Sequence, residues 1–404
     1  MSAAGRIQAV SQARRAELLA LTRARKMARS AHAYVRGKTV KFYDWLDASN
    51  RCALPDGPPV WICGDCHVGN LGPLASKDGR VNIQIRDLDQ TVIGNPAHDL
   101  VRLGLSLATA ARGSDLPGAT TALMVEEMVK GYAEALNGSV SRKTIQERQS
   151  EAVGGILDQA LRRRWKHLAR ERIKNISPGI PAGEHFWALR KSERDEIEQL
   201  VESEPVRQLV TSLKGRKRSD KVRLLDAAYW IKGCSSLGRL RYAVLVGIGK
   251  KYSRENGLCL LDFKEATAAA APRSKGAAMP QDNAVRVVTG ANALSPNLGQ
   301  RMVAGRLGGA AVVIRELMPQ DLKLEVDSLT RDQAVHVARY LSGVVGHAHA
   351  RQMDKATRAA WRRELLRFSS KLDAPPWLWN SVVELVASHE AGYLEHCRKF
   401  ALAA

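Results

Sequence analysis

The sequence has no long apolar run. This excludes a membrane-spanning helix, which needs about 20 consecutive apolar residues. The first 30 residues also lack the apolar stretch of a secretory signal peptide. Cysteine is scarce, with six in 404 residues, at positions 52, 63, 66, 234, 259 and 397. This spacing offers neither a dense disulfide framework nor a second cysteine pair for a four-ligand zinc site. We therefore expect a globular protein of the reducing cytoplasm.

Acidic residues are few relative to basic ones: 41 Asp and Glu face 62 Lys and Arg, giving a formal charge of +21. Basic residues gather between Asp158 and Lys174 and again at 214–218. Such charge attracts an acidic substrate, a nucleic acid or another anionic partner. Trp165 is the only aromatic residue in the first run, whereas single-strand binding usually adds interleaved aromatic side chains. A solvated helix face is therefore the favoured interpretation, and nucleic-acid binding the less favoured one.

Residues 61–102 form the most informative segment, because acidic and amide side chains follow two strand-like runs. Asp65 and Asn70 come after a short apolar run, and Asp87 and Asp89 after a run of alternating polarity. Phosphoryl transfer needs one carboxylate to orient or accept the proton of the attacking hydroxyl, and oxygen ligands that hold magnesium against phosphates. We predict Asp65 as the base, Asn70 and Asp87 as magnesium ligands, and Asp89 in support of the metal site.

Structural roles compete with this prediction, because Asp and Asn also favour turns and caps. His67 lies two residues after the predicted base, where it could contact phosphate or orient the loop. A structural histidine that bonds to the backbone fits the same position. Asp99 opens a helix expected to run to about Arg112, and we interpret it as a brace for the catalytic loop near the helix N-terminus.

A competing motif overlaps the same segment. Cys63-Gly-Asp-Cys66-His67 matches the pattern of c-type haem attachment and, less closely, a redox dithiol or half a zinc site. Haem attachment follows export, for which the N-terminus shows no signal. We therefore expect Cys63 to pack in the core.

The order GDxHxxN, DxD and GxPxxDL within residues 61–102 resembles the catalytic segment of aminoglycoside phosphotransferases and other small-molecule kinases of the protein-kinase-like fold. The chain is more similar still to the bacterial family called domain of unknown function 2252. The resemblance extends over most of the chain and is weak at 115–225 and in the final fifty residues. It implies a phosphotransferase that uses ATP and Mg²⁺ and has an unidentified hydroxyl-bearing acceptor, which the basic surface suggests is anionic.

The resemblance also implies a circular permutation, because a glycine-rich loop and a strand lysine precede the catalytic loop in ordinary kinases and follow it here. Gly233 to Gly238, with Ser235 and Ser236 inside, is expected to form a turn whose backbone N–H groups cover phosphate oxygens. Lys264 follows in a strand-like run, where the phosphate-binding lysine would lie.

The family pattern places a glutamate before an Arg-Val pair as the ionic partner of that lysine, whereas this chain has Gln300. A neutral amide cannot pair the charge of an ammonium group. Either Glu265 or Glu316 is then expected to serve, or nucleotide binding is altered. A nucleotide-binding pseudokinase therefore stays open as an alternative, as does nucleotidyl transfer by the same residues.

The predicted fold is α+β, a two-lobed kinase-like arrangement that is mostly helical with a small antiparallel β-lobe. The expected parts are N-terminal helices at 1–50, the catalytic and metal-binding core at 51–115, a basic substrate-side helical region at 116–225, a nucleotide-binding β-lobe at 226–320 and C-terminal helices at 321–404.

Local signals place the expected elements more closely. Helices are expected from Ser11 to Arg29 and from Ala31 to Leu46, and a last strand from Val312 to Leu317. Thr330 and Gln333 form a predicted capping box at the start of a helix.

Overall fold

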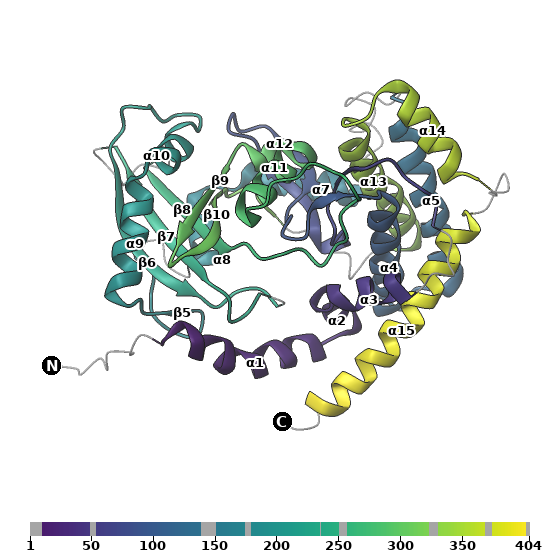
Figure 1. Cartoon of the computed structure of the whole chain (residues 1–404), viewed down its shortest axis with the longest axis horizontal. Coiled ribbons are helices and arrows are strands. Elements are labelled where there is room, and N and C mark those ends of the chain that lie inside the picture. Colours follow the sequence, from purple (N-terminus) through teal and green to yellow (C-terminus); the bar gives the residue numbers. More distant parts are fainter. Residues whose placement is uncertain are drawn as a thin grey trace.

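The computed structural model describes residues 10–48, 54–138, 151–173, 179–234, 236–249, 257–322, 330–367 and 374–400. Within these ranges a unit built on a β-sheet and a helical unit lie on opposite sides of the molecule (Figure 1). Helices combined with antiparallel strands confirm the predicted α+β class. No helix in the described ranges is long and apolar enough to cross a membrane.

The main sheet is antiparallel, and its described strands follow the order β5-β6-β7-β8-β10-β9. Their bounds are β5 Phe186–Trp187, β6 Val222–Trp230, β7 Arg241–Ile248, β8 Leu258–Glu265, β9 Met302–Leu307 and β10 Ala310–Leu317. Strands β7 and β8 are buried along most of their length, as continuous apolar runs predict. Helices α9 (Lys191–Glu202) and α10 (Glu204–Thr211) pack on one face, and α8 (Trp165–Arg172) packs on the other.

Helices α11 (Asn283–Leu294) and α12 (Pro296–Gly299) connect β8 to β9. The Asp282 carboxylate caps α11 by accepting hydrogen bonds from the backbone N–H groups of Ala284 and Val285. This helix contacts β9 and β10, so it belongs to the unit that carries the sheet.

The N-terminal helices lie along one edge of both units (Figure 1). They are α1 Gln12–Ala28, α2 Ala31–Gly37 and α3 Thr39–Ala48. The single helix predicted from Ala31 to Leu46 is therefore wrong. Lys38 leaves the helical conformation, with φ −119° and ψ 49°. The break comes just after Gly37, where α2 crosses α1 so closely that a Cβ would lie 2.5 Å from Met27 Sδ.

An ionic network fastens α1 to the sheet unit. The buried Arg15 guanidinium donates to both carboxylate oxygens of Glu193 at 2.7 and 2.8 Å, and the Tyr242 hydroxyl donates to the same carboxylate. Pairing at both ends offsets the cost of burying these charges.

The helical unit is built around α4 Ala97–Gly113, α5 Gly118–Leu136, α13 Arg331–Ala350, α14 Lys355–Leu365 and α15 Pro376–Phe400, with α7 Glu151–Arg162 beside it. Helices α5 and α13 pack closely at Gly131, where a Cβ would lie 2.1 Å from the Arg339 carbonyl oxygen. The predicted capping box at Thr330 and Gln333 is confirmed, since each side chain accepts a hydrogen bond from the other residue's backbone N–H.

Two short ribbons contact both units. Strand β1 (Val60–Ile62) pairs with β4 (Val92–Gly94), and β2 (Leu71–Ala75) pairs with β3 (Val81–Ile85). They contact α11 and α12 on the sheet side and α13 on the helical side. The loops after β1 and β3 carry the acidic residues singled out in the sequence.

Buried His389 in α15 predicts a loss of stability in acid. Burial lowers the pKa of its imidazole from 6.5 to about 4, and its Nε2 atom has no hydrogen-bond partner among the described residues. Between pH 6.5 and 4 the unfolded chain binds this proton and the folded chain does not, so stability falls as pH falls. The expected contribution is about 3 kcal/mol at pH 4. Urea unfolding at pH 7 and pH 4 should show a smaller acid loss for His389→Leu than for the wild type, and equal losses would contradict this origin.

Candidate functional site

Asn70 joins the two loops that carry the predicted site. It ends the short helix η1 (Val68–Asn70), and its side chain is buried. Its Nδ2 donates to the backbone carbonyl of Asp65 at 3.1 Å and to that of Asp87 at 3.2 Å. The Asn70 carbonyl in turn accepts a hydrogen bond from the backbone N–H of Arg86 at 2.8 Å. The structure therefore brings these predicted residues together, and the bonded amide nitrogen leaves Oδ1 of Asn70 as its free ligand atom.

Lys264 of β8 reaches this loop from the sheet. Its ammonium lies 3.0 and 3.2 Å from the Asp87 carboxylate oxygens, and it also contacts the carboxylate of Asp89. The Asp87 side chain is still 47% exposed, although its neighbours are mostly covered. The ion pairs link the sheet unit to the loop after β3 and place a lysine, two carboxylates and one amide at a single position.

The two carboxylates have unlike acidities. Burial would raise the pKa of Asp87, but the charge of Lys264, together with hydrogen bonds from Asp89 and Lys264 and the charge of Arg241, outweighs burial and holds that pKa below its ordinary value. Burial and the charge of Asp87 raise the pKa of Asp89 to about 6. Burial would lower the pKa of Lys264, yet both carboxylates outweigh it and raise that pKa. Asp87 is thus the carboxylate that stays ionised most firmly.

Asp65 is held by Arg102 of α4. The fully buried guanidinium donates from Nε to Asp65 Oδ1 at 2.9 Å, and from Nη2 to the Val35 carbonyl at 2.7 Å. Burial raises the pKa of Asp65, while Arg102 opposes that rise. The Asp65 side chain is 17% exposed. Arg102 therefore orients the Asp65 carboxylate, which still reaches the surface.

His67 lies beside this pair, with Nε2 3.9 Å from Asp65 Oδ2. Burial, together with the charges of Arg36 and Arg102, holds the pKa of His67 well below 6.5. The ring is therefore neutral at pH 7. Its Nδ1 is buried without a hydrogen-bond partner among the described residues, a position that fits a ligand-facing role as well as a structural one.

Arg102 was not singled out from the sequence. The available signal was its spacing of three from Asp99, which puts both side chains on one face of a helix. Asp99 accepts hydrogen bonds from the backbone N–H groups of Cys63 at 2.7 Å and Gly64 at 2.9 Å. This confirms Asp99 as a brace of the loop. Arg102, one helical turn later, holds the same loop through the Asp65 carboxylate.

Helix α13 supports the loop from behind. His349 Nε2 lies 3.2 Å from the Asp99 carboxylate, and Gln352 exchanges two hydrogen bonds with the backbone of Trp61. The last region of the chain thereby reinforces the segment that precedes Asp65.

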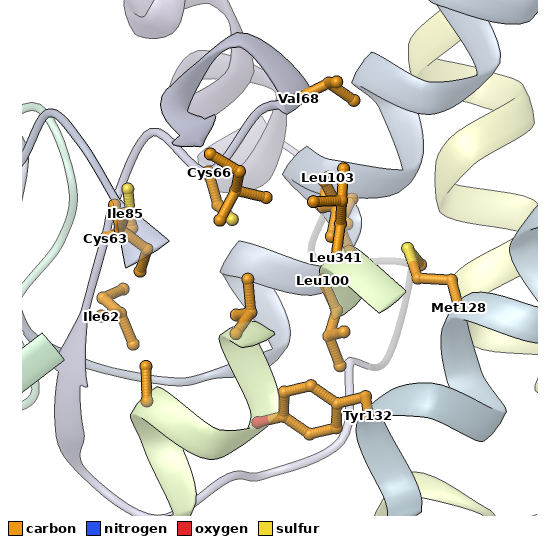
Figure 2. Close-up of a cluster of buried hydrophobic side chains, with 14 of the residues drawn as sticks. Ile62, Cys63, Cys66, Val68, Ile85, Leu100, Leu103, Met128, Tyr132 and Leu341 are labelled. Carbon is orange, nitrogen blue, oxygen red and sulfur yellow. The ribbon is translucent and has the colours of Figure 1, made fainter. Parts of the chain in front are cut away.

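The two cysteines of the competing motif belong to the core. Figure 2 shows the side chains of the buried cluster, among them Ile62, Cys63, Cys66, Val68, Leu100, Leu103, Met128 and Leu341. Both thiols are fully buried, and burial raises the pKa of Cys63 well above its ordinary value. The expected packing of Cys63 is confirmed, and neither thiol faces solvent where a haem or zinc ion would need it.

The glycine turn joins β6 to β7 as predicted. Gly233 and Gly238 have φ values of 97° and 92°, which favour glycine, and the N–H of Arg239 bonds to the Ser236 carbonyl. Ser235 lies outside the described residues. Helix α1 packs on this turn, since a Cβ on Gly238 would lie 2.6 Å from Ala16 Cα. No hydrogen bond in the described part of the chain joins the turn to the acidic loop.

Neither Glu316 nor Glu265, the expected ionic partners of Lys264, pairs with it in the described residues. Glu316 lies on the opposite face of the sheet, because the strand register pairs it with Leu261, and it forms an ion pair with Arg216 at 2.9 Å. Glu265 accepts a hydrogen bond from the backbone N–H of Leu240 at 2.8 Å. Gln300 is exposed at the end of α12. The structure assigns the partner role to Asp87 and Asp89 instead.

The donor set suits Mg²⁺, which prefers oxygen ligands and keeps several waters or phosphate oxygens in its shell. Asn70, Asp87 and Asp89 offer such oxygens, and both carboxylates remain partly exposed. Across the described ranges, no group of three or more His, Cys, Asp or Glu side chains could hold a metal without other ligands. A magnesium ion here would complete its shell with waters or with the oxygens of a bound phosphate.

A family model matches residues 14–399, nearly the whole chain, and its description reads "Uncharacterized protein conserved in bacteria (DUF2252)". Neither a curated protein nor a solved structure matches the chain.

Proposed function

We propose, from the premise that the chain belongs to the bacterial DUF2252 family, that it is a magnesium-dependent phosphotransferase acting on the hydroxyl group of an acceptor. The donor is a phosphoanhydride, and ATP is the one that the kinase-like resemblance implies. The observation that carries the proposal is the contact of Lys264 with Asp87 and Asp89 beside Asn70 and Asp65. A phosphate-binding cation, two candidate magnesium ligands and a candidate base meet there.

The sheet topology supports the proposal. Protein kinases carry a glycine-rich loop over the phosphates, a lysine on the third strand and a helix whose glutamate pairs with that lysine. Here the glycine turn joins β6 to β7, Lys264 lies on the next strand β8, and α11 follows. The catalytic loop comes earlier in the chain, which is the order of a permuted kinase-like fold. Helix α11 instead contributes Arg286, which donates to the backbone carbonyl of Asp89 at 3.0 Å.

Each side chain has a task in this proposal. Asp65, directed by Arg102, accepts the proton of the attacking hydroxyl as the new P–O bond forms. Asn70 Oδ1 and the Asp87 carboxylate would hold magnesium, which would neutralise charge on the donor's phosphates. Lys264 would move from its carboxylate partners to a phosphate oxygen, and neutral His67 would donate or accept a hydrogen bond beside Asp65.

The proposal is tested by following phosphoryl transfer with ³¹P NMR. The purified protein is incubated with Mg²⁺, ATP and pools of hydroxyl-bearing small molecules. We expect a phosphomonoester signal to appear with the wild type and with Asp78→Asn, which removes an exposed carboxylate from the β2–β3 turn. Asp87→Asn should lower the rate at least 100-fold, because it removes a metal ligand. Equal rates for Asp87→Asn and the wild type would contradict the site.

A further inference from the structure

The face of the sheet that carries Lys264 is unusually charged beside that lysine. Strand register places Arg241 opposite Lys264, and Arg315 opposite Asp262, which lies two residues before Lys264 on the same face. The Arg241 Nε atom donates to Asp262 Oδ1 at 2.9 Å. Arg315 donates from Nη1 to the Arg86 carbonyl at 2.9 Å, directly before Asp87. Charged groups therefore continue from the proposed phosphate site along the sheet.

The apolar part of the same face is already covered. Leu245, Leu260 and Leu317 are buried against Leu168 and Ala169 of α8. The segment before α8 also binds the chain just after β10, where Arg163 donates to the Pro319 carbonyl and Gln320 donates to the Arg163 carbonyl. In the described residues these contacts occupy the apolar surface and the Pro319 carbonyl just after β10, groups that a nucleobase bound on this face would need.

What remains beside Lys264 is a group that we call the basic cluster. It consists of Arg86, Arg172, Lys232, Arg241 and Arg315. The Lys232 ammonium lies 3.9 Å from the centre of the Trp230 ring, and the Arg241 guanidinium lies 5.3 Å from the same ring. These side chains come from the residue after β3, from α8, from the segment after β6 and from strands β7 and β10, so the fold gathers them from distant parts of the chain.

Positive charge is in excess within the basic cluster. The nearby carboxylates are already engaged. Asp262 pairs with Arg241, and Asp87 pairs with Lys264. Asp321 pairs with Arg301 at 2.9 Å and lies 3.6 Å from Arg315, and Glu171 pairs with Arg172 at 3.0 Å. Lys232 has no carboxylate within 4 Å among the described residues, and the buried Nε atoms of Arg86, Arg172 and Arg315 make no hydrogen bond there.

The cations also repel one another. Burial, with Arg172 and Arg241 next, holds the pKa of Lys232 well below its ordinary value. Gathering like charges at a partly buried position is costly unless an anion compensates them. Several cations gathered next to a proposed phosphate-binding lysine match an anion that carries several charges close together.

We propose that the basic cluster binds a linear chain of phosphate groups, and that the phosphoryl donor is inorganic polyphosphate. This inference rests on the proposed function for its assignment of Lys264, Asp65 and Asp87. The acceptor hydroxyl forms a new bond to the terminal phosphorus and passes its proton to Asp65. The bond from that phosphorus to the bridging oxygen breaks, and the shortened chain leaves with the electron pair, held by the basic cluster.

The binding half is tested by calorimetric titration of the whole protein with tripolyphosphate at about 0.15 M salt without magnesium. Lys232→Gln should weaken binding about tenfold, because one charge-assisted contact is lost. Lys166→Gln removes the same charge from the exposed side of α8 and should leave the Kd unchanged. Without ligand, Lys232→Gln should melt no lower than the wild type, because a repelling charge is removed. Equal Kd values for the wild type and Lys232→Gln would overturn the proposal.

The donor half is tested by offering tripolyphosphate and ATP in separate reactions with the same acceptors. Faster transfer from tripolyphosphate, lowered by both Lys232→Gln and Asp87→Asn, is the expected result. Transfer from ATP alone, still dependent on Asp87, would overturn the inference and leave the proposed function intact. Tripolyphosphate binding that depends on Lys232, with no Asp87-dependent transfer from either donor, would contradict the proposed function and the donor role while supporting the binding site.

Discussion

Replacing Asp65 by asparagine should lower the rate of phosphoryl transfer by about 10²–10⁴-fold, the usual contribution of a general base. The amide keeps the size of the side chain and can still accept a hydrogen bond from Arg102, so the loop should hold its shape. It cannot take the proton of an attacking hydroxyl. The Kd for the phosphoanhydride donor should stay within about twofold, because the phosphate-binding contacts are assigned to Lys264 and to the metal ligands. Transfer rates and donor binding measured on one preparation separate the two effects.

The matched control is Asp78→Asn, which removes an exposed carboxylate whose nearest ionic partner, Arg80, is also exposed. Its rate should equal that of the wild type. If Asp65→Asn transfers phosphoryl groups as fast as Asp78→Asn, Asp65 is not the base, and neutral His67 becomes the next candidate for proton transfer.

Replacing Asp99 by alanine should lower the free energy of unfolding by about 3–5 kcal/mol, the largest stability effect that we expect from a side chain near the site. The fully buried carboxylate accepts from the backbone N–H groups of Cys63 and Gly64 and lies 3.2 Å from His349 Nε2. Alanine leaves these donors buried without an acceptor. The loss is measured by urea unfolding.

Two further variants serve as controls for the stability loss expected of Asp99→Ala. Asp99→Asn retains one carbonyl oxygen and should lose less stability than alanine. Asp44→Ala removes an exposed carboxylate from α3 and should change stability by no more than about 0.5 kcal/mol. A loss for Asp99→Ala as small as that for Asp44→Ala would show that the brace contributes little to the fold.

The sequence was sufficient for features that depend on local signals. Strand-like runs and short spacings predict one site that contains Asp65, Asn70 and Asp87, and Asn70 does bond to the backbones of both acidic loops. The capping box at Thr330 follows from residues three positions apart, and it is present. In such cases the relevant atoms are close in the chain, so residue type and spacing are informative.

Long-range partners could not be predicted in this way. Lys264 was expected to need a glutamate from its own lobe, but its carboxylates come from a loop about 175 positions earlier. The roles of Arg102 and the basic cluster cannot be predicted from local spacing for the same reason, because they arise from packing between elements distant in sequence. Glu316 does not pair with Lys264, because the alternation of β10 turns it to the opposite face of the sheet.

The central claim is that Lys264, Asp87 and Asn70 form one magnesium-dependent site for a phosphoanhydride. The most direct measurement is the melting temperature of the wild type titrated with ATP or tripolyphosphate, with and without Mg²⁺, beside Asp87→Asn and Lys264→Ala. The account predicts a rise that increases with Mg²⁺ in the wild type, loses its magnesium dependence in Asp87→Asn and is strongly reduced in Lys264→Ala. A rise of the same size in all three proteins, with or without Mg²⁺, would contradict the account and assign phosphate binding to the basic surface alone.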